Sequence, residues 1–402
     1  MAELLRLAVH NYRCLRHVDF AAARINVLFG PNGVGKTTFL DALWFVRDCF
    51  LHGLAEAASS RPLRIGALAD AARPGEERID IDIETHAVTY RITFDYSSGR
   101  MPPLVGERLL SKKRRTELLS RSVGSDHAKF YLERFRTHSQ WRLSSPEDLA
   151  LNQYKLLSKG DDEGIELVSL LRSLHCYSGR EVNLSNLRRI GCESGTRTYP
   201  LERWENLWSA LRNLNDQRAI DERFETIIQY MRKAFPQAFR DLVFEQFGPE
   251  RVTGSSVEHG RRRPIQASGV SDGHLQLLGL LTALFGDMRD HSSLLLFDEP
   301  DTSLHPHALA VFAEAVREAA QQWNRQVFLA THSPVLISQF EPSDVVVAEA
   351  GEDRSTTLRR VSEIAELHDL IDQYSVGSLY MAEQVGAQSA LEMQTPTGGN
   401  GE

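Results

Sequence analysis

The residues best suited to chemistry form a glycine-rich segment near the start of the chain. Its sequence matches the pattern G-x-x-x-x-G-K-[ST] at every fixed position and reads Gly30, Pro31, Asn32, Gly33, Val34, Gly35, Lys36, Thr37. Glycines let backbone N–H groups turn toward a phosphate, and a following helix N-terminus adds donors and partial positive charge. Lys36 is then a point charge for the β- and γ-phosphates, and the Thr37 hydroxyl is a hard ligand for Mg²⁺. The pattern predicts a site for ATP and Mg²⁺, in which we include Thr38.

Two adjacent carboxylates follow an apolar run later in the chain. Residues 294–297 are all apolar, and Asp298 and Glu299 come directly after them. A buried strand does not normally end in two acids unless something pairs with them. We expect Asp298 to hold the magnesium ion and Glu299 to take a proton from the attacking water as general base. The alternative is a pair of ordinary turn carboxylates.

Two further segments could contact phosphate. His332 follows a buried strand at 327–330, where it could donate a hydrogen bond to the γ-phosphate or act only as a polar cap. Ser271 and Gly273 precede a helix that begins near Leu275, so they form either a second anion site or an ordinary helix cap. A second anion site would serve the γ-phosphate of a nucleotide held by another subunit.

The elements around these residues indicate an α/β fold. In residues 1–96, short alternating strands surround the glycine-rich segment, the helix that follows it at 36–50, and a β-hairpin at 79–94. Residues 97–265 have long polar helical patterns and predict a mostly helical insertion. Residues 266–388 return to buried strands and a helix opened by Pro306. Residues 389–402 are rich in glycine and threonine, which predicts a disordered tail.

The composition narrows the class of protein. The chain has 402 residues, a net charge of −8 and a hydrophobic fraction of 42%, which fits a globular protein and argues against one that coats nucleic acid with its whole surface. The four cysteines form no CxxC pair, so we expect neither a disulfide framework nor a zinc site. No signal peptide opens the chain, and the apolar stretch at 275–285 is too short to span a bilayer. A cytoplasmic location without membrane contact is expected.

The order of these motifs resembles the ATPase head of the ABC class. Residues 298–306 read D-E-P-D-T-S-L-H-P, a version typical of RecF-like and OLD-like ATPases and of "AAA family" ATPases in bacterial defence operons. Residues 11–15, N-Y-R-C-L, resemble the start of the same proteins. The resemblance covers residues 1 to about 96 and 266 to about 385. It implies a P-loop NTPase head of ABC type, with a mixed central sheet flanked by helices.

The resemblance also implies roles for several residues. The family closes as a head-to-head dimer over ATP, so Ser271 and Gly273 would act in trans, Asp301 would lie on the loop between subunits, and His332 would be the switch histidine. A glutamine that senses Mg²⁺ and water is also expected, and Gln153 is a candidate, although an exposed helix glutamine is the alternative. The signature reads V-S-D-G-H at 270–274, not L-S-G-G-Q. The OLD nucleases carry a C-terminal Toprim domain, for which too little sequence follows His332, so no nuclease is expected.

Three functions fit these features. The first is the ATPase subunit of an anti-phage defence system, a homodimer or higher homo-oligomer that works with a separately encoded nuclease or toxin. The second is a RecF-like DNA-repair ATPase that clamps duplex DNA. The third, a transporter subunit, is disfavoured because Leu304 to Pro306 replace the usual L-D. Basic runs at 112–115 and 261–263 could meet DNA phosphates or be solvated loops.

Overall fold

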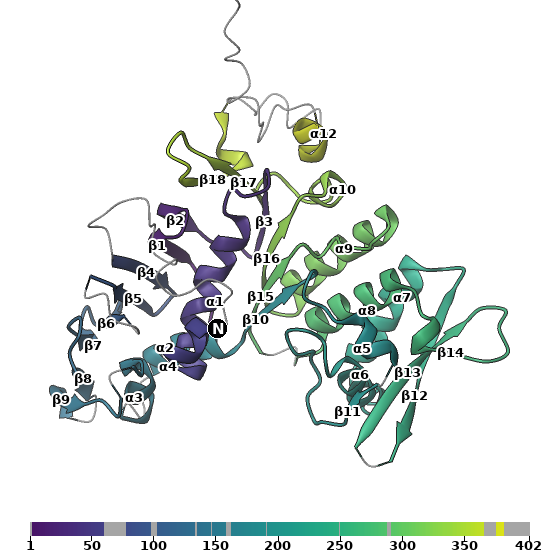
Figure 1. Ribbon diagram of the computed structural model, residues 1–402, viewed down its shortest axis with the longest axis horizontal. Coiled ribbons are helices and arrows are strands. Elements are labelled where there is room, and N and C mark those ends of the chain that lie inside the picture. Colours follow the sequence, from purple (N-terminus) through teal and green to yellow (C-terminus); the bar gives the residue numbers. More distant parts are fainter. Residues whose placement is uncertain are drawn as a thin grey trace, which may run out of the picture.

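The computed structural model describes residues 2–59, 78–97, 103–132, 135–145, 147–157, 162–189, 191–248, 250–287, 291–365 and 375–381. These residues form three β-sheets with helices packed between and beside them (Figure 1). A six-stranded sheet lies at the centre, between an eight-stranded antiparallel sheet and a smaller four-stranded sheet.

The central sheet is the scaffold of the fold. Its strands occur in the order β10-β15-β16-β3-β17-β18, and all neighbours are parallel except β17 and β18. Parallel strands are buried on both faces and therefore read as continuous apolar runs, as predicted for 294–297 and 327–330. The strands are β3 (Ile25–Phe29), β10 (Leu174–Ser178), β15 (Ser293–Asp298), β16 (Arg325–Thr331), β17 (Val345–Ala350) and β18 (Thr356–Arg360).

One face of the central sheet packs against α1 (Lys36–His52) and the antiparallel sheet. Leu296 and Phe328 share a core cluster with Phe39 and Leu43 of α1 and with Ile81 of the antiparallel sheet. The predicted hairpin at 79–94 is confirmed as β4 and β5. In spatial order the antiparallel sheet is β2 (Leu15–Ala21), β1 (Arg6–Tyr12), β4 (Arg78–Glu84), β5 (Val88–Asp95), β6 (Leu104–Ser111), β7 (Glu117–Arg121), β8 (His127–Leu132) and β9 (Thr137–Arg142).

The other face of the central sheet is covered mainly by α8 and α9. Leu295 and Leu329 lie in a second core cluster with Leu281 of α8 and Phe312 of α9. Pro306 opens α9 as predicted. The elements that complete this side are α5 (Leu184–Arg189), β11 (Cys192–Glu193), α6 (Leu207–Asp216), α7 (Arg223–Ala234), β12 (Phe239–Phe247), β13 (Arg251–Glu258), β14 (Ile265–Gln266), α8 (Asp272–Phe285) and α9 (Pro306–Gln322).

The shorter helices cap the ends of this arrangement. Helix α2 packs on the end of α1, while α3 and α4 pack beside the antiparallel sheet. Helices α10 and α12 pack on each other. Their bounds are α2 (Leu54–Ser59), α3 (Ala150–Leu157), α4 (Asp162–Arg172), α10 (Pro334–Ile337) and α12 (Val376–Met381).

The segment 97–265 differs from its prediction as a mostly helical insertion. It contains helices α3 to α7, but strands β6 to β9 extend the antiparallel sheet, β10 enters the central sheet, and β11 to β13 form most of the smallest sheet. The local pattern misled because these strands carry many polar residues: β9 has no buried residue, and β12 buries only Phe239 and Leu242. Such strands depend on backbone pairing with neighbours more than on their own apolar face. The tail at 389–402 lies outside the described residues.

The described helices and cysteines bear on two further expectations. None of these helices combines the length and the apolar character needed to cross a bilayer. Cys14, Cys176 and Cys192 are free thiols, and Cys49, Cys176 and Cys192 are buried.

Candidate nucleotide-binding site

The glycine-rich segment connects β3 directly to α1. Gly35 is the N-cap of α1 and has the left-handed dihedrals φ 103° and ψ 10°. A Cβ at this position would lie 2.2 Å from Thr356 Oγ1, so glycine is required by packing as well as by conformation. The loop is thereby held against the central sheet, with the N-terminus of α1 behind it.

Lys36 is the first residue of α1 and is almost fully buried. Its Nζ donates hydrogen bonds to Gly30 O at 2.7 Å and Pro31 O at 2.8 Å, and it lies 3.4 Å from His332 Nδ1. Burial lowers the pKa of Lys36 to about 8, although Glu299 and Asp298 oppose that shift. The ammonium of Lys36 is therefore mostly protonated at neutral pH. The loop carbonyls hold it in the position where a bound phosphate would replace them as its partner.

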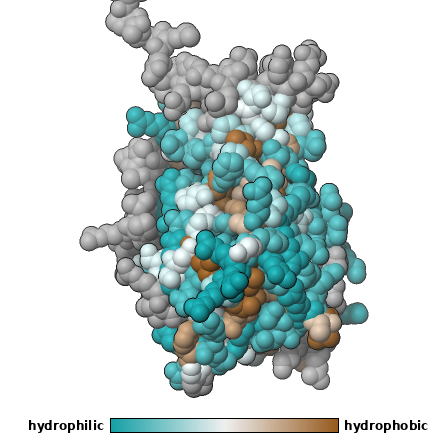
Figure 2. Space-filling model, turned by 90° about the vertical axis from the view of Figure 1, so that its right-hand side faces the viewer, coloured by the Kyte–Doolittle hydropathy of each residue, from teal (hydrophilic) through white to brown (hydrophobic). Residues whose placement is uncertain are grey.

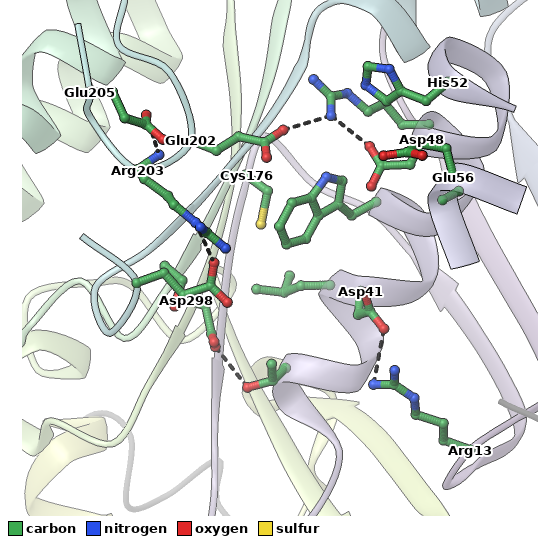
Figure 3. Close-up of a pocket in the computed structure, with 17 residues that line it drawn as sticks. Arg13, Asp41, Asp48, His52, Glu56, Cys176, Glu202, Arg203, Glu205 and Asp298 are labelled. Carbon is green, nitrogen blue, oxygen red and sulfur yellow. Dashed lines mark hydrogen bonds and ion pairs between the residues drawn. The ribbon is translucent and has the colours of Figure 1, made fainter. Parts of the chain in front are cut away.

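Thr37 and Asp298 meet on the side of the loop that faces β15. Thr37 Oγ1 donates a hydrogen bond to Asp298 Oδ1 at 2.8 Å (Figure 3). Burial raises the pKa of Asp298 to about 6, while the hydrogen bond from Thr37 acts in the opposite direction.

The donor set at this point fits magnesium held jointly with a nucleotide. A hydroxyl and a carboxylate are hard oxygen ligands, and Mg²⁺ commonly takes one or two carboxylates plus substrate phosphates rather than a complete protein cage. No group of three or more His, Cys, Asp or Glu side chains that could hold a metal occurs among the described residues. Thr37 and Asp298, which lie in hydrogen-bond contact, could hold such an ion together with substrate phosphates.

Glu299 follows β15 with a left-handed backbone, φ 51°. Its N–H donates to Ala330 O at 2.8 Å, which ties it to the end of β16. One carboxylate oxygen, Oε1, lies 3.6 Å from His332 Nε2 and accepts a hydrogen bond from Arg180 Nη2 at 2.6 Å. Burial and the neighbouring Lys36 lower the pKa of His332, so this imidazole is neutral at physiological pH. Lys36, His332, Glu299 and Arg180 thus form one continuous polar chain.

These side chains line one small cavity. Its volume is about 350 Å³, and the residues around it are Asn32, Gly33, Gly35, Lys36, Thr37, Thr38, Arg180, Glu299 and His332. The cavity lies at the carboxyl ends of β3, β15 and β16, the edge where open α/β sheets bind ligands. A cavity with one lysine, one arginine, a helix N-terminus and two hydroxyls is suited to a polyphosphate.

Ser271, Gly273 and Asp301 lie outside that cavity. Ser271 is the N-cap of α8, and its Oγ lies 2.6 Å from His274 Nδ1. A Cβ at Gly273 would lie 3.0 Å from Ser303 O, so the start of α8 adjoins the loop that follows β15. Asp301, on that loop, accepts a hydrogen bond from Thr331 Oγ1 at 2.7 Å. Ser271 is exposed.

Gln153 is not brought to the site, which corrects its assignment as a metal ligand. It lies on α3, a helix that packs against β7 and β8 of the antiparallel sheet. Its Nε2 donates to Arg142 O at 3.3 Å. The physical reason is that α3 follows the last strand of the antiparallel sheet and stays with it, whereas β10 is the segment that runs to the site.

Sequence reasoning missed the residues that follow β10. Ser178 pairs with Asp298 across the sheet, and Gly179 and Arg180 continue beside Glu299. The available signal was the short run 174–178 ended by a glycine, which resembles a strand followed by a turn. It lay unrecognised in a segment interpreted as helical.

A second, larger cavity adjoins Thr37 and Asp298. Its volume is about 530 Å³ and it lies between α1 and residues 202–205 (Figure 3). Most of its charged groups are paired within the wall: Arg13 with Asp41, Arg47 with Asp48 and Glu202, and Arg203 with Glu181. The Arg47–Glu202 pair connects α1 to the segment after β10.

The basic runs are exposed only in part. Lys112 pairs with Glu84 at 2.6 Å, Arg114 with Glu163 at 3.2 Å, and Arg261 with Glu258 at 3.1 Å, whereas Arg262 and Arg263 are exposed. The face shown in Figure 2 is largely hydrophilic, and its apolar areas are small and separate in the part that the structure describes.

Comparison with known proteins identifies the family. Residues 25–338 match the family described as "AAA domain, putative AbiEii toxin, Type IV TA system". Similarity to curated proteins is confined to short stretches. Protein ea59 of Escherichia phage lambda is 36% identical over 74 residues, 18% of this chain and 14% of that protein. The DNA replication and repair protein RecF of Bacteroides thetaiotaomicron is 41% identical over 51 residues, 12% of this chain and 14% of that protein.

An OLD nuclease of Thermus scotoductus is 48% identical over 40 residues, 10% of this chain and 8% of that protein. The chain therefore spans only a small part of these relatives. The predicted resemblance to RecF and OLD proteins is nevertheless confirmed.

Solved structures show the same architecture over most of the chain. An Smc head bound to the C-winged helix domain of ScpA covers 89% of this chain and 97% of that chain, with 14% identity and a TM-score of 0.51. An Smc head with an extended coiled coil from Pyrococcus furiosus covers 93% and 100%, with 12% identity and a TM-score of 0.50. At such identity the likeness shows the fold alone, and it confirms the prediction of an ABC-type ATPase head.

Proposed function

We propose, from the premise that this chain belongs to the AAA domain family matched over residues 25–338, that it binds ATP with Mg²⁺ and hydrolyses it. The observation that carries the proposal is the cavity in which Lys36, Thr37, Glu299 and His332 meet, with Asp298 hydrogen-bonded to Thr37. These residues come from three separate segments. Their meeting at one sheet edge supports a shared chemical role more strongly than any one motif does.

Each side chain has a task that follows from its position. Lys36 and the N–H groups before α1 bind the β- and γ-phosphates. Bound Mg²⁺ would neutralise phosphate charge, with Thr37 and Asp298 as its protein ligands. Glu299 accepts a proton from the attacking water as the water oxygen bonds to the γ-phosphorus and the bond to the bridging oxygen breaks, leaving ADP and phosphate. His332 donates from its neutral imidazole toward the γ-phosphate.

The proposed assembly is a homodimer, or a higher homo-oligomer, closed over ATP. Its support is the exposed position of Ser271 at the N-terminus of α8, outside the cavity that contains Lys36. The helix start directs N–H donors and partial positive charge outward, where a phosphate held by a second copy could meet them. In this arrangement Gly273 and Asp301 also face the partner.

The proposed biological role is that of the ATPase subunit in an anti-phage defence system, acting with a separately encoded nuclease or toxin. The AbiEii toxin description of the family and the similarity to a phage lambda protein support this role. The alternative is a RecF-like repair ATPase that clamps duplex DNA, supported by the RecF match and by exposed Arg262 and Arg263.

The deciding experiment is steady-state ATP hydrolysis by the purified protein, with and without linear duplex DNA, at low and moderate salt. Lys36→Ala is the control for contaminating ATPases and should remove both nucleotide binding and turnover. Turnover that is unaffected by DNA favours a regulator with a protein partner. Strong stimulation that fades with salt favours the DNA clamp, because phosphate contacts release counterions. Wild-type protein that neither binds nor hydrolyses ATP would refute the proposal.

A further inference from the structure

Arg180 holds the carboxylate of Glu299 through both oxygens. Its Nη2 donates to Oε1 at 2.6 Å and its Nε donates to Oε2, which gives a bidentate pair. The two partners differ in exposure: the Glu299 side chain is 16% exposed and the Arg180 side chain is 68% exposed. The carboxylate is therefore fixed in the site, whereas the guanidinium reaches it from solvent and is free to turn elsewhere.

Backbone contacts fix Gly179, the residue before Arg180, beside Glu299. Gly179 N–H donates to Asp298 O at 2.8 Å, and a Cβ at Gly179 would lie 2.2 Å from Glu299 O. The loop after β10 and the loop after β15 therefore touch at a residue that has no side chain. Arg180 is the next residue and therefore lies close to Glu299. It lines the same cavity as Lys36 and Thr38.

This pair conflicts with the role of Glu299 as a base. A carboxylate whose two oxygens both accept from a guanidinium has half of its lone-pair sites occupied and is held in one orientation, which limits how it can orient a water and take its proton. An exposed ion pair is weak, however, because water competes with it. A terminal phosphate in the same cavity carries more negative charge than one carboxylate and matches the planar fork of arginine equally well.

We propose that Arg180 is a positioning residue that switches between two partners. It restrains Glu299 when no γ-phosphate is present, and it moves to the γ-phosphate when ATP binds, which frees the carboxylate for the water. This inference rests on the proposed ATPase function. It adds a residue whose partner depends on whether the bound nucleotide has a third phosphate. ADP lacks that phosphate, so with ADP the restraint on Glu299 stays in place.

The test compares binding of a triphosphate and a diphosphate by the full chain. Affinities for AMPPNP, which carries a third phosphate and resists hydrolysis, and for ADP are measured by calorimetry with Mg²⁺ in wild type, Arg180→Ala and Arg180→Lys. Arg180→Ala should lower the affinity for AMPPNP about tenfold and change the affinity for ADP by less than about twofold. Arg180→Lys should recover part of the loss, because it keeps the charge without the fork.

A matched control is Arg142→Ala. Arg142 is also exposed and ion-paired, with Asp126 at 3.3 Å, but it lies on β9 away from the cavity. It should leave both affinities unchanged. If Arg180→Ala lowers the affinities for AMPPNP and ADP equally, or lowers neither, the proposed switch is wrong.

Failure of the switch is distinguishable from failure of the ATPase assignment. If wild type binds both nucleotides, Lys36→Ala removes binding and Arg180→Ala leaves the AMPPNP-to-ADP ratio unchanged, only the switch is wrong. If wild type binds neither nucleotide, the ATPase assignment fails and the switch fails with it.

Discussion

Thr37 Oγ1 donates a hydrogen bond to Asp298 Oδ1 at 2.8 Å, although 261 positions separate the two residues in the chain. The bond joins the start of α1 to the end of β15, two elements that the central sheet brings to one edge. Asp298 is buried, so its charge has little access to water and depends on this donor.

Replacing the hydroxyl of Thr37 should therefore weaken both folding and metal binding. Thr37→Val keeps the shape but leaves the buried carboxylate without its donor, which should cost about 1–3 kcal/mol in the free energy of unfolding. Mg²⁺-dependent enhancement of nucleotide binding should also fall. Urea unfolding and calorimetry with and without Mg²⁺ measure the two effects. Thr226→Val, which removes an exposed hydroxyl bonded to Glu222 O, is the control. Unchanged Mg²⁺ dependence would contradict the assignment of Thr37.

Glu299→Gln should separate binding from hydrolysis. Glutamine keeps the size of the side chain but cannot accept the proton of water, so turnover should fall about 100-fold or more while ATP still binds. Without hydrolysis, the ATP-bound protein should accumulate as a closed dimer, detected by light scattering after gel filtration with ATP. Turnover at the wild-type rate would show that Glu299 is not the base.

Gly179→Ala should disturb the site through the backbone alone. The added Cβ would lie 2.2 Å from Glu299 O, so one of the two loops has to move. A displacement of about 1 Å at a catalytic group costs about 100-fold in rate. Gly195→Ala is a matched control, because a Cβ there meets nothing closer than Ser209 Oγ at 4.0 Å. If both variants hydrolyse ATP at the wild-type rate, the contact between the two loops has no catalytic importance.

His175 on β10 should make stability depend on pH. Burial lowers its pKa from 6.5 to about 4, so the folded chain holds the ring neutral. Above about pH 6.5 the ring is neutral in both states and stability is greatest. Between about pH 6.5 and 4 the unfolded chain takes up a proton that the folded chain does not, so the free energy of unfolding falls by up to about 3 kcal/mol.

His175→Phe should remove this part of the loss while keeping a ring beside Tyr199, whose centroid lies 4.9 Å away. Urea unfolding of both proteins at about pH 7.5 and about pH 5 measures the difference. An equal loss of stability in the two proteins would show that His175 does not contribute to the pH dependence.

The positions of the phosphate-loop residues and of the acidic pair could be predicted because each motif consists of contiguous residues. Lys36 and Thr37 need only the turn and the helix start that follow Gly35, and Asp298 and Glu299 need only the strand that precedes them. Glycine conformation, helix polarity and apolar burial act over a few residues, so a single segment carries the information.

The rest was decided by pairing between distant segments. Strand β10 contains polar residues and lies among segments with helical patterns, so its sequence alone does not identify it as a strand. Only its parallel pairing with β15 brings Arg180 to Glu299. The same pairing logic leaves Gln153 with the antiparallel sheet and turns much of 97–265 into strands. Strand pairing joins backbones across long stretches of chain, and its energy depends on neighbours that a local pattern does not contain. The sequence by itself therefore indicated the phosphate loop and the acidic pair, because each depends on its own short segment, and only the tertiary structure placed Arg180 against Glu299.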